Sequence, residues 1–185
     1  MKKRLISLML IVALVLAPIP VVKAEETNWI GYTAISDKAE LNHIRNNLSG
    51  KYYLTKDIVF TPIDFANGGD FYNEGAGWIP IGTDEVTAFN GVLDGNGFNI
   101  SGLYCKISQS IPNVYIGLFG YNKGTIQNLG MINGNIQGIS TSLDSDSNVY
   151  VGGILGYNYN GNISNCYFTG KVSSEHSSYN SKTFE

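Results

Sequence analysis

The sequence of 185 residues has few of the groups on which enzymes and disulfide-rich proteins depend. It contains two cysteines and two histidines, and only 15% of its residues are charged. Two cysteines are too few for a disulfide framework, and the histidines, His43 and His176, lie far apart. No Ser/His/Asp order, CxxC pair or phosphate-binding loop is present. We therefore predict no enzyme activity, no metal site and no cofactor.

Long apolar runs are absent except at the N-terminus. Basic residues at 2–4 precede an apolar run over 5–17, and VKA at 22–24 gives a small-x-small pattern. This layout is typical of a secretory signal peptide, and the MKKR opening resembles bacterial ones. The apolar run of about 13 residues is shorter than the roughly 20 that cross a bilayer as a helix. We predict a signal peptide over 1–24, no membrane span after its cleavage, and a secreted or cell-surface location.

The remaining chain is acidic and has the length of one domain. Cleavage removes four of the 12 basic residues, which leaves 8 against 15 acidic residues and a formal charge of −7. No basic run remains that would bind nucleic acid or an anionic membrane. Glycine and tyrosine are abundant, at 22 and 12 residues, and such a composition is typical of exported β-rich proteins.

The most informative feature is an internal repeat. GLFGYNKGTIQNLGMINGNI (117–136) returns as GILGYNYNGNISNCYFTGKV (153–172), about 36 residues later. The residues that recur in both copies are mainly glycine and asparagine, which set the backbone conformation and are not reactive groups. Self-similarity at this period indicates a solenoid. The matches that matter most are Gly120/Gly156, expected to permit a corner, Ile126/Ile163, expected to stack in the core, and Asn128/Asn165, expected to form an amide ladder.

Elements before the repeats can also be predicted. DKAE at 37–40 fits a capping box, and Leu41, Ile44 and Leu48 fall on one helical face, which predicts a short helix over 37–48. KYYLTKDIVF (51–60) alternates and predicts a strand.

Turns, loops and isolated polar groups complete this part of the chain. A long loop is expected over 61–77, and DGNG at 94–97 predicts a turn with positive φ angles. His43 is expected to face solvent and Asp94 to cap the turn. DSDSN at 144–148 lacks the glycine and glutamate of a calcium loop, which favours a solvated loop.

The repeats resemble the GLUG motif, whose pattern runs roughly Gly-Leu-x-Gly-x-Asn-x-Gly-x-Ile-x-Asn-x-x-x-x-Gly-x-Val. GILGYNYNGNISNCYFTGKV matches nearly every position, whereas GLFGYNKGTIQNLG is followed by MINGNI, with one extra residue. WIPIG…FNGVLDGNGFNISGL and AELNHIRNNLSGKYYLTKDI resemble the lead-in segments of such repeats in exported bacterial proteins. Together these resemblances cover about Ala39 to Val172.

This resemblance implies an all-β fold, a right-handed parallel β-helix (β-solenoid) with a short N-terminal capping helix. Residues 25–50 are expected to form a leader and that helix. Residues 51–185 are expected to form the β-helix domain, with GLUG-like repeats at 115–139 and 150–173 and a truncated C-terminal end. The family is adhesin-like and also occurs in immunoglobulin A peptidases, where a separate zinc domain carries HExxH. This sequence has no HExxH, so that activity is not carried over.

Function is expected from the tyrosines of the repeats. Tyr115, Tyr121, Tyr157 and Tyr159 either stack between strands or form an exposed aromatic ladder for a ligand. We predict an exported, non-catalytic, adhesin-like structural or binding module whose partner is an extracellular protein or carbohydrate, with further repeats of a longer chain as another possible partner. The alternatives are a β-helical carbohydrate-active enzyme, which needs two carboxylates across one cleft, and an accessory repeat region of a larger secreted peptidase.

Two further expectations follow from the stacking of coils. Cys105 and Cys166 should be unpaired, because two strand spacings, roughly 9.6 Å, exceed the roughly 7 Å Cα separation that a disulfide tolerates. The residues after Val172 contain no amphipathic helix or closing hairpin. We therefore expect an uncovered C-terminal end, with either marginal stability or end-to-end association through the coil near Phe168.

Overall fold

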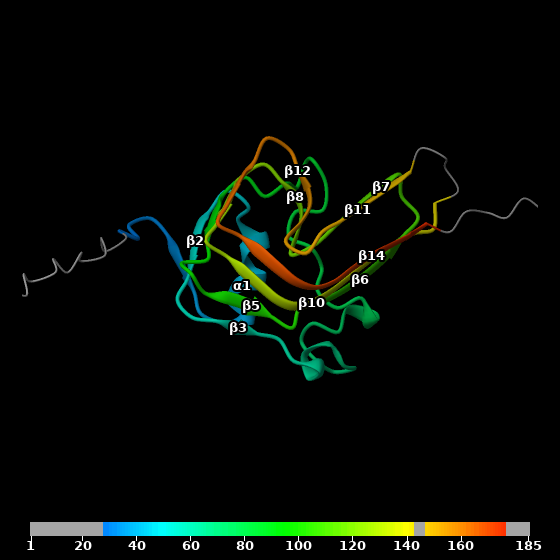
Figure 1. The fold of residues 1–185 in the computed structure, drawn as a ribbon, viewed down its shortest axis with the longest axis horizontal. Helices are drawn as coiled ribbons and strands as arrows, with labels where there is room; N and C mark the ends of the chain where they lie inside the picture. Colours follow the sequence, from blue (N-terminus) through cyan, green and yellow to red (C-terminus); the bar gives the residue numbers. More distant parts are fainter. Residues whose placement is uncertain (1–27, 143–146, 177–185) are drawn as a thin grey trace, which may run out of the picture.

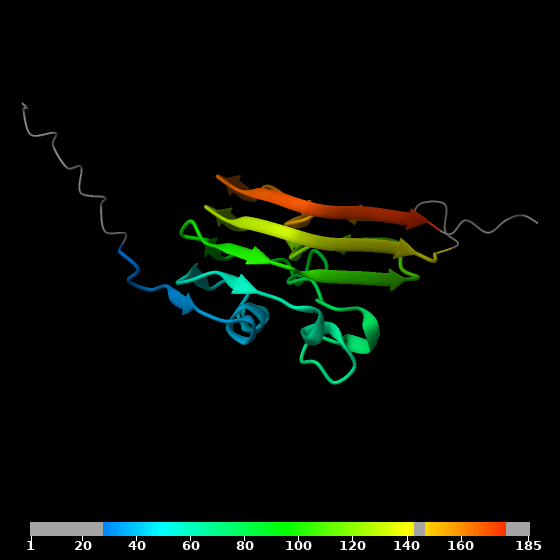
Figure 2. The same ribbon diagram turned by 60° about the horizontal axis from the view of Figure 1, so that its bottom comes forward.

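The chain folds into layers of parallel strands with one short α-helix. The computed structural model describes residues 28–142 and 147–176, so the predicted signal peptide and most of the DSDSN loop lie outside the described residues. Successive passes of the chain lie one above another (Figures 1 and 2), and every pair of named strands is parallel. The all-β prediction is confirmed.

The first sheet has five short strands in the order β1-β2-β4-β9-β13. Its register places Leu93, Ile126 and Ile163 in one column, which confirms the predicted stacking of the two isoleucines. Leu93 and Ile126 are fully buried. The strands are β1 (Thr33–Ile35), β2 (Lys51–Leu54), β4 (Val92–Asp94), β9 (Thr125–Gln127) and β13 (Asn162–Ser164).

The second sheet has the order β14-β10-β5-β3, and β6 also pairs with β10. Ile58, Ile100, Met131 and Phe168 follow one another across it in register. The first three are buried, and Phe168 is partly buried against them. The strands are β3 (Ile58–Val59), β5 (Asn99–Ser101), β6 (Tyr104–Gln109), β10 (Gly130–Ser140) and β14 (Tyr167–His176).

Two short sheets close the opposite side of the core. β7 (Asn113–Ile116) pairs with β11 (Asn148–Val151), and β8 (Phe119–Asn122) pairs with β12 (Leu155–Asn158). Their strands come from the two sequence repeats in turn, so equivalent residues of the repeats become direct neighbours. Figure 1 shows these strands facing β6, β10 and β14 across the interior.

A helix covers one end of the stack (Figure 2). It consists of α1 (Lys38–His43) and the 3-10 turn η1 (Ile44–Asn46), and Leu41 and Ile44 are fully buried beneath it. The Asp37 side chain accepts a hydrogen bond of 2.8 Å from the Glu40 backbone N–H. The Glu40 carboxylate instead accepts from the N–H and hydroxyl of Ser36. The predicted helix is confirmed, and His43 is exposed as expected. One half of the capping box differs, because the Glu40 carboxylate accepts from the N–H of Ser36 rather than from that of Asp37.

The single strand predicted over 51–60 is wrong. The chain bends after β2 and resumes at β3 in the other sheet. Leu54 and Ile58, at 0% and 2% exposure, both face the core, whereas Lys56 between them is exposed, so the apolar alternation is interrupted at the bend. The loop predicted over 61–77 holds two 3-10 turns, η2 (Pro62–Phe65) and η3 (Asn73–Gly75).

The role predicted for Gly120 and Gly156 is also wrong, because both lie inside strands rather than at corners. A Cβ on Gly120 would lie 2.3 Å from the carbonyl oxygen of Gly82, so this glycine permits a close approach between backbones. The corners are made by Asn128 and Asn165, whose φ angles of 53° and 52° are left-handed, a region that asparagine tolerates better than most residues.

Asparagine ladders connect the layers. The Asn165 side-chain amide donates to Asn128 Oδ1 at 3.1 Å, as predicted, and the Asn128 amide donates to Asp94 Oδ1 at 3.0 Å. Asp94 Oδ1 also accepts from the Asn96 N–H at 2.7 Å, which confirms its role in the turn, where Asn96 has a positive φ. A second ladder, in which Asn122 donates to Asn158 at 2.7 Å, was not predicted.

Substitutions in the column of Ile126 and Ile163 should show how much coverage by the next layer contributes to the free energy of unfolding. Ile126→Ala should lower the free energy of unfolding by about 2–5 kcal/mol, because it opens a cavity in a closed layer. Ile163→Ala should cost less than half as much, because the Ile163 side chain is 41% exposed. Urea unfolding of both variants measures the difference, and equal losses would contradict the layered core.

The two cysteines differ in accessibility. Both are free, and burial raises the pKa of the Cys105 thiol to about 12. Burial also raises the pKa of Cys166, which is only half-buried. We expect a thiol reagent to modify Cys105 far more slowly than Cys166 in the folded protein, since the thiolate is the reactive form. Protein that is unfolded without a reducing agent should contain two reactive thiols per chain. A count of zero thiols would contradict the unpaired state of the cysteines.

Candidate functional site

The tyrosines predicted as ligand contacts come together in the structure. Tyr115 lies on β7 and Tyr121 on β8. Tyr150 is the register partner of Tyr115, and Tyr157 on β12 is the partner of Tyr121. Tyr159 follows β12 directly. The two repeats therefore build one group of five tyrosines, which we call the tyrosine cluster.

Ring contacts hold the tyrosine cluster together. Tyr115 stacks on Tyr150 with ring centroids 5.1 Å apart and an interplanar angle of 14°. Tyr115 meets Tyr121 edge-on at 5.2 Å, and Tyr157 lies 5.1 Å from Tyr121. Tyr159 reaches Tyr121 at 6.2 Å. These separations fall in the range of favourable aromatic pairs, so the cluster has a defined shape.

The members of the tyrosine cluster differ in exposure. Tyr121 is buried, whereas Tyr115, Tyr150 and Tyr157 are half-buried. Tyr159 is the most exposed, at 45%. A ligand on this surface would therefore meet Tyr159 and the faces or edges of the half-buried rings, with Tyr121 supporting them from below.

A lysine that the sequence analysis missed lies against the cluster. Lys123 Nζ is 5.7 Å from the Tyr121 ring centroid and 5.5 Å from that of Tyr159. The same atom lies 3.2 Å from Glu85 Oε1. Lys123 is two residues after Tyr121 in the sequence, but Glu85 comes from the preceding loop, and no repeat pattern connects the two. The cluster thus carries a cation and a carboxylate at its edge.

The environment shifts two phenols of the cluster. Burial raises the pKa of Tyr121, and the nearby Glu85 carboxylate raises it further. Burial likewise raises the pKa of Tyr115, with smaller contributions from Tyr150 and Tyr157. Both effects keep these phenols neutral, so they act as hydrogen-bonding groups on an apolar surface.

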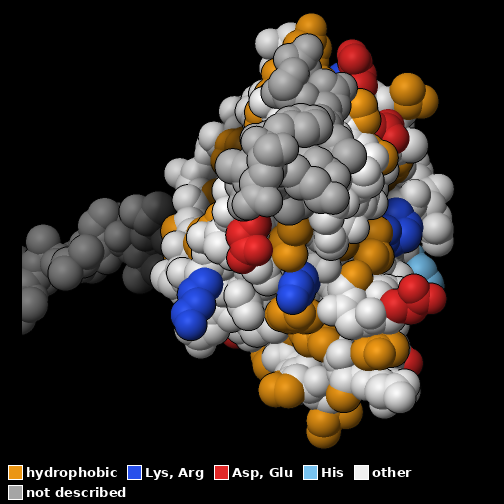
Figure 3. Space-filling model, turned by 90° about the vertical axis from the view of Figure 1, so that its right-hand side faces the viewer, with side chains coloured by type: hydrophobic (Ala, Val, Ile, Leu, Met, Phe, Trp, Pro, Cys, Tyr) orange, Lys and Arg blue, Asp and Glu red, His pale blue; other side chains and the backbone are white. Residues whose placement is uncertain are grey.

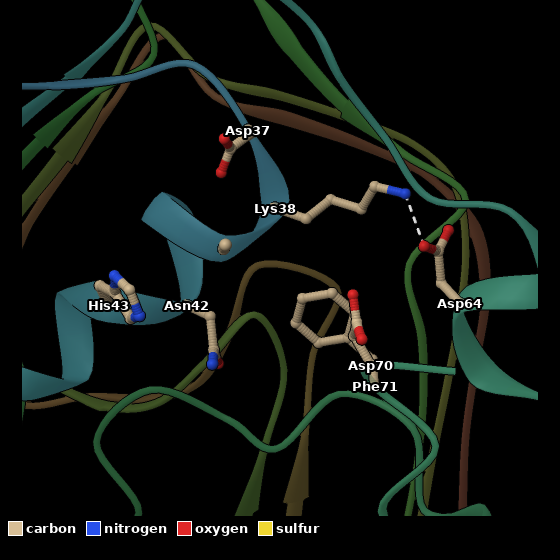
Figure 4. Close-up of a pocket in the computed structure, with 8 residues that line it drawn as sticks. Asp37, Lys38, Asn42, His43, Asp64, Asp70 and Phe71 are labelled. Carbon is tan, nitrogen blue, oxygen red and sulfur yellow. Dashed lines mark hydrogen bonds and ion pairs between the residues drawn. The ribbon is translucent and has the colours of Figure 1, made fainter. Parts of the chain in front are cut away.

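A concave surface lies between α1 and the loop that follows β3 (Figure 4). Asn42 and His43 border a hollow of about 330 Å³ from the helix, and Asp70 and Phe71 border it from the loop. The full lining is Asp37, Lys38, Ala39, Asn42, His43, Asp64, Asp70 and Phe71.

Two of the three carboxylates in this hollow are already engaged. Asp37 caps α1, and Asp64 forms an ion pair with Lys38 Nζ at 2.5 Å. Partial burial alone would raise the pKa of Asp64, but hydrogen bonds from Lys38 and Thr61 outweigh it and hold that pKa below its usual range. The ion pair between Asp64 and Lys38 therefore fastens the loop to the helix.

The remaining surface offers little concentrated charge. On the face shown in Figure 3, acidic and basic side chains are few and intermingled. Within residues 28–142 and 147–176, no group of three or more His, Cys, Asp or Glu side chains is arranged to hold a metal ion. In the same part of the chain, no helix is long and apolar enough to cross a bilayer.

The model of the GLUG motif matches residues 147–173. The second repeat is a GLUG motif. This match confirms the resemblance on which the fold was predicted and contains Tyr150, Tyr157 and Tyr159 of the tyrosine cluster. It also contains Asn158 and Asn165, the upper members of the two asparagine ladders.

Two relatives are much longer than this chain. A protein of Evansella cellulosilytica described as a Gly-rich membrane protein is 37% identical over 101 residues, which are 52% of this chain and 10% of that protein. Halomucin of Haloquadratum walsbyi is 31% identical over 134 residues, which are 67% of this chain and 1% of halomucin. The chain thus spans a tenth or less of the length of these relatives.

One solved structure shares part of the shape. It is a chain named as an immunoglobulin A1 protease of Bacteroides ovatus, with 18% identity and a TM-score of 0.43. The superposition covers 77% of this chain and 58% of that one.

We expect tyrosine titration to detect the cluster. Tyr115 and Tyr121, together with Tyr52, should ionise above the ordinary tyrosine pKa, because burial raises their pKa values. A raised folded pKa stabilises the fold fully below the ordinary tyrosine pKa, near 10, and this contribution is lost as pH rises through the folded value. The absorbance of tyrosinate, followed against pH, measures the fraction of tyrosine that ionises above the ordinary pKa. Tyr115→Phe should reduce this fraction. Ionisation of all tyrosines in one ordinary step would contradict it.

Proposed function

We propose that the chain is an exported, non-catalytic, adhesin-like binding module that acts at the cell surface or after secretion. It is a right-handed parallel β-helix, and it holds an extracellular carbohydrate or protein on its tyrosine cluster. The observation that carries this proposal is the cluster itself, in which two successive repeats bring five tyrosines together on neighbouring sheets.

The chemistry of the cluster suits a sugar or a polar protein surface. A tyrosine ring offers an apolar face for stacking and a hydroxyl for hydrogen bonds. Lys123 and Glu85 add a donor and an acceptor at the edge of the same surface. Because the rings already contact one another, little side-chain freedom remains to be lost on binding.

The β-helix is supported by the order of the strands. β4, β9 and β13 stack in the first sheet, and β5, β10 and β14 stack in the second. Each pass of the chain thus visits the sheets in the same sequence and in register. The corners at Asn128 and Asn165 recur at equivalent positions, as a solenoid requires.

The location outside the cell is supported by the sequence and by the relatives. The N-terminal sequence has the layout of a signal peptide, and the chain predicted to remain after cleavage is acidic with few charges. The relative from Evansella cellulosilytica is described as a membrane protein, and the other relative is a halomucin.

A carbohydrate-active enzyme is the second candidate, favoured by the three carboxylates that line the hollow beside α1. Glycosidases need one carboxyl group as an acid and another as a base or nucleophile. Asp37 already caps α1, and Asp64 already forms an ion pair with Lys38. The binding module is therefore the stronger proposal.

A glycan array followed by calorimetry tests the binding site. Tyr159→Ala should weaken the binding of a selected glycan or surface protein about five- to tenfold, because one exposed ring contributes about 1–1.4 kcal/mol. Tyr72→Ala, a half-buried tyrosine in the loop before β4, is the matched control and should leave binding unchanged.

Two outcomes would overturn this proposal. Equal binding by the wild type and by Tyr159→Ala would place the ligand elsewhere on the molecule. Release of shortened glycans by the wild-type chain, abolished by Asp70→Asn, would make the hollow beside α1 a catalytic site.

A further inference from the structure

The end of the stack opposite α1 is formed by β11, β12, β13 and β14 (Figure 2). Each of these strands is the last in its sheet order among the described residues. Backbone groups on their outer side therefore meet no further described strand. Such edges are able to add a strand from another chain. We call this surface the open layer.

The open layer has the side chains of a core layer. Phe168 and Leu155 continue columns whose lower members, Met131 and Phe119, are fully buried. Exposure nevertheless rises sharply in the open layer, where Ile163 and Val172 are 41% and 44% exposed. Apolar groups in these positions are stabilised by any surface that covers them.

The other end of the stack does not match the open layer. α1 and η1 lie across it, and Leu41 and Ile44 are fully buried there. A head-to-tail stack of copies would have to displace this helix. The surface on a second copy that is best suited to the open layer is the open layer itself, which gives a closed two-fold arrangement.

β14 carries a charge pattern that fits this arrangement. Val172 is the register partner of the fully buried Ile136, so it faces the core. Lys171, Ser173 and Glu175 alternate with it and lie on the outer face. Lys171 and Glu175 are equally distant from Ser173 and opposite in charge.

We propose that the chain forms a two-fold dimer in which β14 pairs antiparallel with β14 of a second copy, centred on Ser173. This register sets Lys171 of each copy opposite Glu175 of the other. It also keeps Val172 opposite Ser174 on the inner face, because directly opposed residues of an antiparallel pair share a face.

The register is specific. A dimer centred on Val172 would place Lys171 opposite Ser173, and one centred on Ser174 would place Glu175 opposite Ser173. Both lose the two charge pairs. The open layer contributes about 20 strand residues per copy, close to the 20–30 residues a side of a stable interface. The dimer would carry two tyrosine clusters and so bind a repetitive ligand with avidity.

Charge reversal tests the dimer. Sedimentation velocity over a range of concentrations should show a reversible dimer of the wild type. Lys171→Glu and Glu175→Lys should each raise the dissociation constant about tenfold or more, because two facing pairs become like-charged. An equimolar mixture of these two variants should dimerise like the wild type, since each then meets opposite charges.

Two further variants control for the change in net charge. The double variant Lys171→Glu/Glu175→Lys keeps the net charge and should dimerise normally. Lys106→Glu makes the same change as Lys171→Glu on an exposed residue of β6, two strands away in the second sheet, and should have no effect. Circular dichroism checks that each variant is folded.

The proposal fails under any of three results. In the first, the wild type stays monomeric at every concentration. In the second, the wild type grows into open-ended polymers. In the third, a mixture of Lys171→Glu with Glu175→Lys does not associate. An effect of Lys106→Glu as large as that of Lys171→Glu would also overturn it, because net charge would then explain the loss.

Discussion

The parallel, in-register pairing of strands from successive passes is the constraint on which the rest of the structure depends. Neighbouring strands in a sheet lie about 4.8 Å apart, so equivalent side chains of two passes are in direct contact. Leu93, Ile126 and Ile163 form one such column. No pass can bury its apolar face alone, and each depends on the pass beside it.

The same constraint shapes the polar and aromatic features of the molecule. Asn128 receives a hydrogen bond from Asn165 and donates one to Asp94, so a turn residue also connects three layers. Register brings Tyr150 onto Tyr115 in the same way. A repeat that serves the backbone thus also brings equivalent tyrosines of the two repeats into contact.

Stacking also gives the molecule two unlike ends. α1 covers one end, and the Lys38–Asp64 ion pair fastens it to the neighbouring loop. Because the folded pKa of Asp64 is lowered, this fastening is complete above the ordinary carboxylate pKa and is lost as pH falls through the folded value. The open layer consists of strands that are last in their sheets among the described residues, and its apolar columns are partly exposed.

The sequence alone determined the class of fold, the column through Ile126, the ladder through Asn128 and the position of the helix. These follow from short periodic patterns, in which one residue predicts its equivalent about 36 positions later. It also pointed to the four tyrosines Tyr115, Tyr121, Tyr157 and Tyr159, of which Tyr121 and Tyr157 are equivalent positions of the two repeats. Only the tertiary structure showed that Tyr121 is buried and that Glu85 and Lys123 meet beside it. It alone showed the bend within 51–60 and the true role of Gly120, because one exposed lysine, Lys56, in an alternating pattern does not by itself mark a corner, and a glycine does not record which backbone approaches it.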